Sequence, residues 1–512
     1  MTNASTSPVK KAVIVAVFLS LGSKFLAFFK DIVLANFFGV GIASDAYFIA
    51  NLIPGLLWLA ILTTISAAFL PQYMKLKIES GNKDIVFVRQ SVRLYAYLAM
   101  ALSLACIAFA DQIVNLSAPM AGADTHELAA QLTRLMALAF VFTGYVGVQN
   151  SLQQANGAFI APLFVPVTNN MIVIAAIIIA SYFDNIAVAV VGAVCAWVIQ
   201  APIQRWQTRH IYSMQIGWRV SEQTWKRLSL LSVPIALAVL LDQLNIFIGI
   251  SIASGFGSGA ISHLNYSSRL ALFAAGLFSW LVSYFLFPAL ASNAAKNDHI
   301  ANGKLLTRGL SIILLSTAPI AAVALAMRTE IVTLVYGRGA FTPRDIADTA
   351  IVFGFYSLGI IFISMRELLN RMFFSYQKTI TPLMIGVGAA LVNLVASFVL
   401  SRQMGVAGIA LGAVAGALFY SVFQIWLLRR WKPVLITRDL LLMFIVTVSA
   451  SSAAYGAGSI FLEQIRDWHY FLRLCSVSIL MLTLYVALAI FLLRVVGIKL
   501  ANLRNLLRES AP

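Results

Sequence analysis

The chain has 512 residues, of which 61% are hydrophobic and 11% are charged, and its formal net charge is +17. Soluble domains contain about 45–50% apolar and about 25% charged residues, so no water-soluble fold could bury this much apolar surface. Within lipid only helices and closed barrels satisfy the backbone, and the apolar runs here are long and continuous rather than alternating. Composition therefore excludes a soluble protein and predicts a helical bundle in a membrane.

The sequence offers few groups that could perform catalysis or hold a metal. Its three cysteines, Cys106, Cys195 and Cys475, lie far apart inside apolar runs and lack the spacing of a metal site. The five histidines do not cluster, and no nucleophile elbow, Walker loop or zinc-protease motif is present. A membrane-embedded enzyme would need a polar catalytic loop, so we expect a transporter without disulfide, metal or cofactor.

Apolar runs separated by breakers predict fourteen transmembrane helices, each long enough to cross about 30 Å of hydrocarbon. Lys10 and Lys11 precede the first run as in a signal peptide, but no small-residue cleavage site follows them, so we expect this run to be kept. In chain order the predicted spans lie near 11–38, 43–71, 89–113, 129–154, 160–182, 186–206, 228–253, 262–292, 305–327, 345–373, 379–401, 405–430, 439–462 and 470–496.

The positive charge is unevenly divided between the two sides of this predicted topology. One side receives 24 of the 36 lysines and arginines, mainly in the loops near 72–88, 205–227 and 293–305 and in the terminal segments. The other side receives six, which are Arg328, Arg338, Arg344, Arg402, Arg466 and Arg473. Under the positive-inside rule both termini are cytoplasmic. Topology and anionic lipid headgroups therefore explain the net charge, and no nucleic-acid partner is expected.

Short motifs repeat along the chain. Phe-Gly-Val-Gly at 38–41 is echoed by Phe-Gly-Ser-Gly at 256–259, an offset of 218, and Phe-Leu-Pro at 69–71 is echoed by Phe287-Pro288. Six predicted helices separate the copies, so the repeat is parallel, with its axis along the membrane normal, as in two-lobed transporters. We predict an N-terminal lobe at 1–210, a C-terminal lobe at 211–430, and two additional helices with a basic tail at 431–512.

Several ionisable residues lie inside predicted spans, where each costs about 2.5–3.5 kcal/mol at a helix centre. Lys24, Lys30 and Asp31 are in the first span, Asp45 begins the second, and Arg269 is in the eighth. One interpretation is structural, with either lysine paired to Asp31 or Asp45. The other is a cationic cavity formed by Lys24, Lys30 and Arg269 for an anionic substrate such as a pyrophosphate.

An ordered set of motifs from about residue 10 to 430 resembles the MurJ (MviN) lipid II flippases of the MOP transporter superfamily. The matching residues are Ser23, Lys24, Lys30 and Asp31; the run at 38–41 with Asp45 and Tyr47; Pro162, Pro166 and Asn170; Pro234 and Gln243; Tyr266, Arg269 and Leu270; Tyr-Gly-Arg-Gly-Ala-Phe-Thr at 336–342; and Thr381, Pro382 and Asn393. Lysine replaces arginine at both cationic positions of the first motif.

The resemblance implies a fourteen-helix inner-membrane protein that moves an undecaprenyl-pyrophosphate-linked saccharide by alternating access, with a lipid-tail groove at its last two helices and the cell-wall synthesis machinery as a possible partner. It assigns substrate binding to Lys24, Lys30 and Arg269. It assigns supporting or gating roles to Asp31, Asp45, Ser23, Gly39 and Gly41. Coupling to sodium, with Asp242 and Asn370 as candidate ligands, or to the membrane potential is implied as a possibility.

Two departures from the family pattern leave the substrate open. The second helix of the family carries two arginines after a proline, whereas residues 54–59 here contain none. A glutamate that usually follows the eighth-helix arginine is absent, with Leu272 nearby. Lipid II is the favoured substrate. The alternatives are another polyprenyl-linked glycan, of exopolysaccharide or O-antigen type, and a drug or cation exporter of the related MATE type, which would need an acidic cavity.

Overall fold

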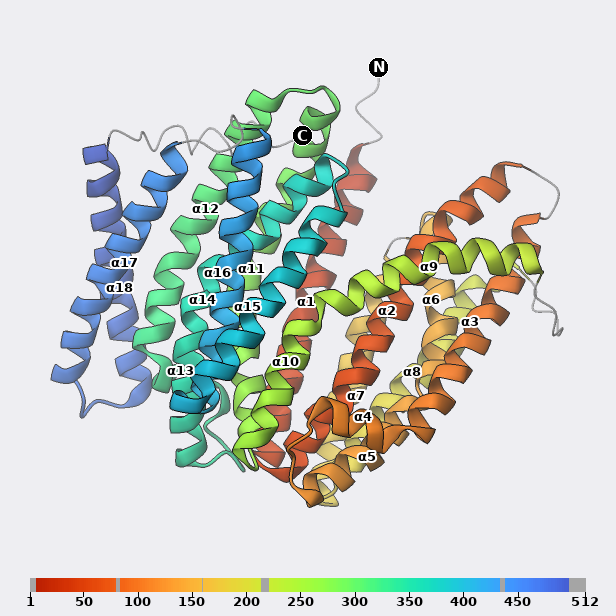
Figure 1. Ribbon diagram of the computed structural model, residues 1–512, viewed down its shortest axis with the longest axis horizontal. Coiled ribbons are helices and arrows are strands. Elements are labelled where there is room, and N and C mark those ends of the chain that lie inside the picture. The colour runs from red at the N-terminus through yellow and green to blue at the C-terminus, as the bar shows by residue number, and fades with distance from the viewer. Residues whose placement is uncertain (1–5, 80–82, 159, 213–220, 433–437, 497–512) are drawn as a thin grey trace. The chain divides into compact units, whose positions relative to one another are not determined.

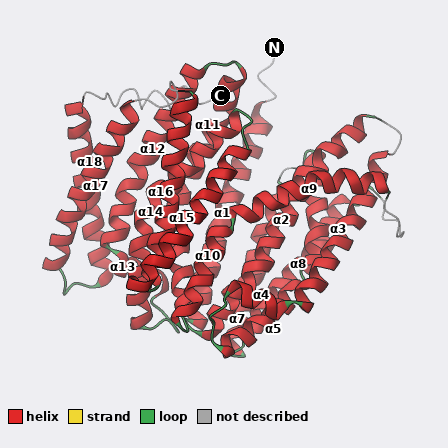
Figure 2. Cartoon of the chain, viewed as in Figure 1, coloured by secondary structure: helices red, strands yellow, loops and turns green. Residues whose placement is uncertain are grey.

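The computed structural model describes residues 6–79, 83–158, 160–212, 221–432 and 438–496. Every regular element in these ranges is a helix, as Figure 2 shows. Packing divides the chain into two compact units. Unit 1 comprises Met1–Gln243, Gly257–Ser262 and Gly339–Phe341, and unit 2 comprises Leu244–Phe256, His263–Arg338 and Thr342–Pro512. The lobe boundaries near 210 and 430 stay a prediction.

The helices have the length and composition of membrane spans. Ten are long and apolar enough to cross a membrane, and three helix pairs would each cross as one bent span, which gives up to thirteen among the described residues. Helix α1 (Thr6–Phe38), with 33 residues, is outside that count. The prediction of an all-helical, multi-pass membrane protein is confirmed.

Three predicted spans each consist of two helices rather than one. The span near 89–113 is divided at Phe109, the span near 129–154 at residues 138–139, and the span near 228–253 at Gln243. None of these break positions is a proline, and the few polar residues beside them, such as Asp111 and Asp242, stand within longer apolar runs. Hydropathy therefore detects the span but not the break, which in the second case is a bend of 42°.

Unit 1 is organised around α2. This helix packs against α5, α6 and α9, while α1 packs against α7. In its core the ring of Phe69 stacks on Tyr73 and Phe87, with centroids 5.6 Å and 5.4 Å away. The helices of unit 1, labelled in Figure 1, are α1, α2 (Ile42–Ile78), α3 (Lys83–Ala108), α4 (Ala110–Ser117), α5 (Ala123–Ala137), α6 (Phe140–Ala155), α7 (Phe164–Tyr182), α8 (Ile186–Thr208) and α9 (Glu222–Asp242), with a 3-10 turn at Ala161–Leu163.

Unit 2 contains the remaining helices, and its element boundaries follow local capping chemistry. Asp298 accepts a hydrogen bond from the Ala301 backbone N–H at the start of α12, and Thr342 and Asp345 form a reciprocal capping box at the start of α14. The helices are α10 (Leu244–Ala253), α11 (Ala260–Ala295), α12 (His299–Ala326), α13 (Arg328–Tyr336), α14 (Pro343–Ser375), α15 (Ile380–Met404), α16 (Val406–Trp431), α17 (Arg438–Gln464) and α18 (Tyr470–Val496), with a 3-10 turn at Ser254–Phe256.

Helices α15 and α16 form a hairpin that packs backbone against backbone. Gly408, Gly412 and Gly416 lie on one face of α16, four residues apart. A Cβ at Gly412 would lie 2.1 Å from the Ser397 Oγ, and one at Gly408 would lie 2.4 Å from the Leu400 carbonyl oxygen. Small residues at this spacing let two membrane helices approach closely where the hydrophobic effect cannot drive them together.

The last two helices, α17 and α18, pack against each other and against α12 and α13 of unit 2 (Figure 1). Their shared apolar cluster includes Ala450, Val477 and Met481. Arg473 of α18 forms an ion pair with the buried Glu330 of α13, with 3.5 Å between Nη1 and Oε1. The pair therefore gives this apolar hairpin one charged point of attachment.

Candidate functional site

The predicted substrate cations of α1 lie in different surroundings. The Lys24 side chain is exposed, whereas the Lys30 Nζ lies 3.7 Å from the Asp31 Oδ1, with 19% and 6% of the two side chains exposed. Lys24 and Asp31, seven residues apart, share one face of the helix. Ser23 donates from its Oγ to the Ser20 carbonyl oxygen at 2.9 Å within the same helix. The structure thus contains one of the predicted pairings, Lys30 with Asp31, and the choice between a structural and a substrate-binding role for Lys30 stays open.

Asp45, the other candidate partner for a lysine, has a different role. Its carboxylate accepts hydrogen bonds from the Gly259 backbone N–H at 2.6 Å, from the Ser262 backbone N–H at 2.8 Å and from the Ser262 Oγ at 2.5 Å. Only 2% of Asp45 is exposed. Because α11 begins at Ala260, this carboxylate caps the helix from outside, where orphan N–H groups favour an anion.

The turn between α1 and α2 is enclosed by a second distant segment. The Ala340 backbone N–H donates to the Asn36 carbonyl oxygen at 2.8 Å. Gly39 has a φ of +56°, and a Cβ there would lie 2.5 Å from the Ala340 carbonyl oxygen. Gly339 has a φ of +59°, and a Cβ there would lie 2.1 Å from the Asn36 carbonyl oxygen. Both glycines are therefore required by backbone conformation and by close approach.

These contacts define a turn lock, formed by residues 36–45, 257–262 and 339–341, all within unit 1. Gly41 is the N-cap of α2, and the Ser44 Oγ donates to the Gly39 carbonyl oxygen at 2.9 Å. The partners Gly259, Ser262 and Asn36 had no assigned role in the sequence analysis. The available signal was the pair of repeated glycine motifs, whose glycines have positive φ in both copies.

Arg269 lies on α11, seven residues after Ser262 and thus on the same face of that helix, and its side chain is exposed. Arg269 belongs to unit 2, whereas Lys24 and Lys30 belong to unit 1. Leu272, which stands near the position of the missing glutamate, is 47% exposed.

The part of α2 that lacks the family's arginines is packed with aromatic groups. The Trp58 ring contacts Phe140 and Trp197, with both centroids 6.1 Å away. These three side chains join two apolar clusters of unit 1 that also involve α6 and α8. The departure from the family pattern thus replaces charge with structural packing.

The candidate ion ligands are only partly described. The Asn370 Oδ1 accepts hydrogen bonds from the Tyr420 hydroxyl at 3.0 Å and from the Gln424 Nε2 at 2.7 Å. The Asp242 side chain lies outside the described residues. Within the ranges that the structure describes, no group of three or more histidine, cysteine or acidic residues could hold a metal. A sodium site at Asp242 and Asn370 stays a prediction.

A second polar group of unit 2 was not assigned a role from the sequence. The Asn393 Nδ2 donates to the Asn245 Oδ1 at 2.9 Å, and the Ser397 Oγ donates to the Asn393 Oδ1 at 2.8 Å. Asn393 and Ser397 are almost fully buried. The sequence singled out Asn393 as a family-matching residue but did not indicate its partners, because the members of the network come from both α10 and α15.

Comparisons with known proteins agree with the motifs. A family model described as lipid II flippase MurJ matches residues 34–496. The chain is 27% identical to the lipid II flippase MurJ of Burkholderia cenocepacia over 78% of this chain and 80% of the relative. It is also 27% identical to a probable lipid II flippase MurJ of Rhizobium tropici, over 96% and 95% of the two chains.

The fold is also found among solved structures. It is similar to a lipid II flippase MurJ in an inward closed conformation, with a TM-score of 0.81, 20% identity, and 94% and 99% of the two chains covered. It is similar to an inward-facing multidrug resistance MATE transporter of the MOP superfamily, with a TM-score of 0.68, 12% identity, and 82% and 98% covered. Since the family model spans most of the sequence, the chain belongs to the lipid II flippase MurJ family.

Proposed function

We propose that this chain moves lipid II, an undecaprenyl-pyrophosphate-linked saccharide, from the cytoplasmic to the periplasmic leaflet of a bacterial inner membrane by alternating access. The observation that carries this proposal is the family match over residues 34–496. The predicted lobes at 1–210 and 211–430 would move around the substrate, and the helices at 431–512 would hold its lipid tail.

Lys24, Lys30 and Arg269 are the groups proposed to bind the pyrophosphate. Lys24 and Arg269 are exposed on helices that are otherwise largely apolar. Ammonium and guanidinium groups form strong charge-assisted hydrogen bonds with phosphate oxygens. Asp31 would hold Lys30 in place between transport cycles through the 3.7 Å ion pair.

The turn lock is proposed as the gate that opens when the substrate leaves. It is held by a few hydrogen bonds to Asp45, by the Asn36–Ala340 backbone bond and by the contact of Gly39 with Ala340. Such a small number of directional bonds at one end of long helices can break without disturbing an apolar core. Coupling of this step to sodium or to the membrane potential is part of the proposal, as is delivery to the cell-wall synthesis machinery.

Complementation tests the substrate directly. Expression of this chain in bacteria depleted of their own lipid II flippase should restore growth and cell shape, and expression of the Lys24→Ala variant should not. A parallel assay with fluorescent lipid II in proteoliposomes should show label becoming accessible to a membrane-impermeant quencher. If the chain instead restores a strain that lacks an O-antigen or exopolysaccharide flippase, the substrate is another polyprenyl-linked glycan. The observation that favours this alternative is the packed Trp58, which lies where the family carries arginines.

Orientation is tested by cysteine labelling in intact cells. We propose that both termini and the loop around Lys296 are cytoplasmic, and that the loop around Arg466 is periplasmic, because basic residues concentrate on the first side. The side chains of Lys296 and Arg466 are both exposed. In a background without native cysteines, Arg466→Cys should react with a membrane-impermeant maleimide, and Lys296→Cys should react only after permeabilisation. The reverse pattern would invert the topology.

A further inference from the structure

Four side chains at three helix ends of unit 2 form a hydrogen-bonded chain around His299, the first residue of α12. The Lys432 Nζ lies 3.1 Å from the His299 Nε2, and the His299 Nδ1 lies 2.9 Å from the Tyr376 hydroxyl. The Asn302 Nδ2 donates to the same hydroxyl at 3.2 Å and to the Leu290 carbonyl oxygen at 3.2 Å. These four side chains, here called the histidine latch, join the ends of α14 and α16 to the start of α12.

The partners of His299 determine which ring nitrogen carries a hydrogen. A lysine ammonium has three N–H donors and no acceptor, so the His299 Nε2 must accept the bond from Lys432. A neutral imidazole has a single N–H, which is then on Nδ1 and donates to the Tyr376 hydroxyl. Both bonds exist together only while His299 is neutral. A proton added at Nε2 would place two donors and two positive charges against each other, so the bond to Lys432 would break.

The other charged groups around the start of α12 do not offset such a charge. Helix α12 packs against α14 and α17, and α14 packs against α16. Besides Lys432, the charged groups at the neighbouring ends of these elements are Lys296 and Asp298 before α12, Lys378 after α14, Arg429 in α16, and Arg438 and Asp439 in α17. Asp298 already accepts the Ala301 backbone N–H at 2.9 Å. Cations outnumber acids in this set, so protonated His299 and Lys432 would repel each other.

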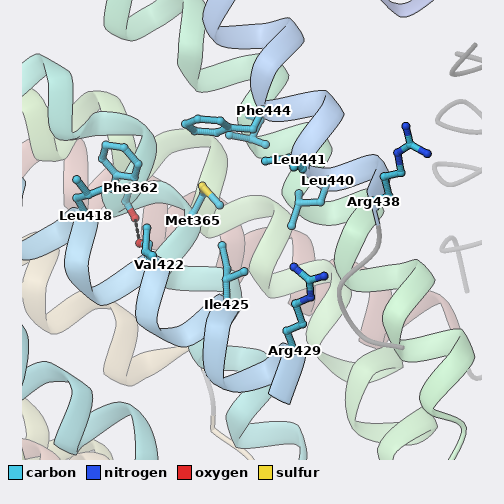
Figure 3. Close-up of a pocket in the computed structure, with 12 residues that line it drawn as sticks. Phe362, Met365, Leu418, Val422, Ile425, Arg429, Arg438, Leu440, Leu441 and Phe444 are labelled. Atoms are coloured by element: carbon cyan, nitrogen blue, oxygen red, sulfur yellow. Dashed lines mark hydrogen bonds between the residues drawn. The ribbon is translucent and has the colours of Figure 1, made fainter. Parts of the chain in front are cut away.

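The end of α16 contacts both the latch and a cavity. The Trp431 ring lies edge-on to Tyr376, with centroids 5.0 Å apart, and the Lys378 Nζ is 4.1 Å from the Trp431 centroid. Arg429, two residues earlier, lines a cavity of about 560 Å³ together with Arg438 of α17 (Figure 3). A helix end beside a cavity loses few contacts when it moves. Loss of one directional bond can therefore release it from α12.

We propose that the histidine latch makes unit 2 sensitive to pH: it is closed while His299 is neutral, and protonation of His299 opens it. Imidazole is the side chain that ordinarily changes its charge between about pH 5 and 8, so the latch is closed at the alkaline end of this range. Alternating access moves lobes largely as rigid bodies, and loosened helix ends should slow that movement. This effect on transport rests on the proposed function. In the proposed orientation the latch is cytoplasmic, so acidification of the cytoplasm would slow transport.

Hydrogen–deuterium exchange of the purified full-length chain tests the latch. The reporters are the backbone N–H groups of residues 376–378, which donate to the carbonyl oxygens of Phe373 and Phe374. Their protection factor, the ratio of the intrinsic to the observed exchange rate, removes the direct effect of pH on the exchange chemistry. A hydrogen bond to a charged group changes a local equilibrium roughly ten-fold or more. The protection factor should therefore fall by about that much from about pH 8 to about pH 5.

Three variants identify the group that titrates. His299→Gln can accept a hydrogen bond but cannot gain a proton, so its protection factor should not depend on pH. Lys432→Met removes the donor and should give low protection at both pH values. Lys378→Met is the matched control, because it removes a neighbouring ammonium group whose contact is the Trp431 ring. It should keep the full pH dependence.

Transport of fluorescent lipid II in proteoliposomes tests the regulatory effect. Acidification of the compartment that faces Lys296 should slow transport by the unaltered chain and leave transport by His299→Gln unchanged. Absence of transport at every pH would contradict the proposed function, whereas the exchange measurement would still decide the existence of the latch. Transport that ignores pH while the latch opens would refute its regulatory effect.

Equal protection factors of the unaltered chain at the two pH values would overturn the proposal without any variant. Retained pH dependence in His299→Gln would place the titrating group elsewhere, and its loss in Lys378→Met would indicate general repulsion among cations. Nitrogen-15 spectra of histidine-labelled protein provide a direct check at about pH 8, with the His299 signals assigned by their loss in His299→Gln. A hydrogen on Nε2 rather than on Nδ1 would show that Lys432 does not donate to the ring.

Discussion

Two helix hairpins, α1–α2 and α15–α16, are both joined through glycine turns but are held in opposite ways. Helices α15 and α16 pack along their whole length through Gly408, Gly412 and Gly416. Helices α1 and α2 touch little along their length, and their turn is held by the bonds of Asp45 and by the contact of Gly39 with Ala340. Steric packing spread over many residues makes a permanent unit, whereas a few directional bonds at one end make a contact that can open.

The largest loss of transport, without loss of stability, should follow removal of the Lys24 cation on α1. Lys24→Ala should abolish lipid II transport in the quencher assay while the thermal midpoint of the purified protein stays the same, because the Lys24 side chain is exposed. Lys24→Arg should keep activity, since a pyrophosphate offers several oxygens to either cation. Arg269→Ala should behave as Lys24→Ala does. Normal transport by stable alanine variants would show that these cations are structural.

Overpacking of the α15–α16 hairpin should, by contrast, lower the stability of the protein. In Gly412→Leu the new side chain meets the Ser397 Oγ and backbone, so the two helices must separate, at a cost of about 1–3 kcal/mol or more. Folded yield and thermal midpoint should fall together with transport. Gly456→Ala in α17 is the control, because a Cβ there would meet nothing within 4 Å. An unchanged midpoint in Gly412→Leu would refute the close helix packing.

The turn lock should be weakened by Asp45→Asn, which keeps the shape of the side chain but removes its charge. Hydrogen bonds to a charged group contribute about 1.5–3 kcal/mol, so this variant should populate the open turn more often. A cysteine at Val40 should then react faster with an impermeant maleimide. Asp111→Asn, which removes an exposed ion pair with Arg134, is the matched control and should change little. Equal labelling of Val40→Cys with and without Asp45→Asn would exclude the lock as a gate.

The smallest effects come from two buried serines, one in each hairpin. Ser44 donates to the Gly39 carbonyl oxygen, and Ser397 donates to the Asn393 Oδ1. Each bond is worth about 0.5–1.5 kcal/mol. Ser44→Ala should raise the labelling rate at Val40 with little change in thermal midpoint, and Ser397→Ala should lower the midpoint only. If both variants change the same property, the contrast between the hairpins fails.

The sequence allowed the class of fold, the positions of the spans and the transporter family to be predicted, and the family match confirms a transporter rather than an enzyme. These features depend on composition and on local motifs. The breaks within spans were missed because hydropathy averaged over a window of about 19 residues smooths over single polar residues such as Asp242 and Gln243. The partners of Asp45 were missed because Gly259 and Ser262 are more than 200 residues away, and no local pattern encodes that contact.

The capping of α11 by Asp45 also bears on the symmetry of the predicted repeat. At the repeat offset of 218, Asp45 corresponds to His263, and Ser262 corresponds to Ser44. Two identical halves would form the carboxylate contact twice, once in each direction. Here Ser44 donates to its own turn, and the His263 Nδ1 lies 2.8 Å from the Thr349 Oγ1. Within the predicted repeat the contact is therefore asymmetric, and the proposed opening of the turn would break the bonds of a single carboxylate, that of Asp45.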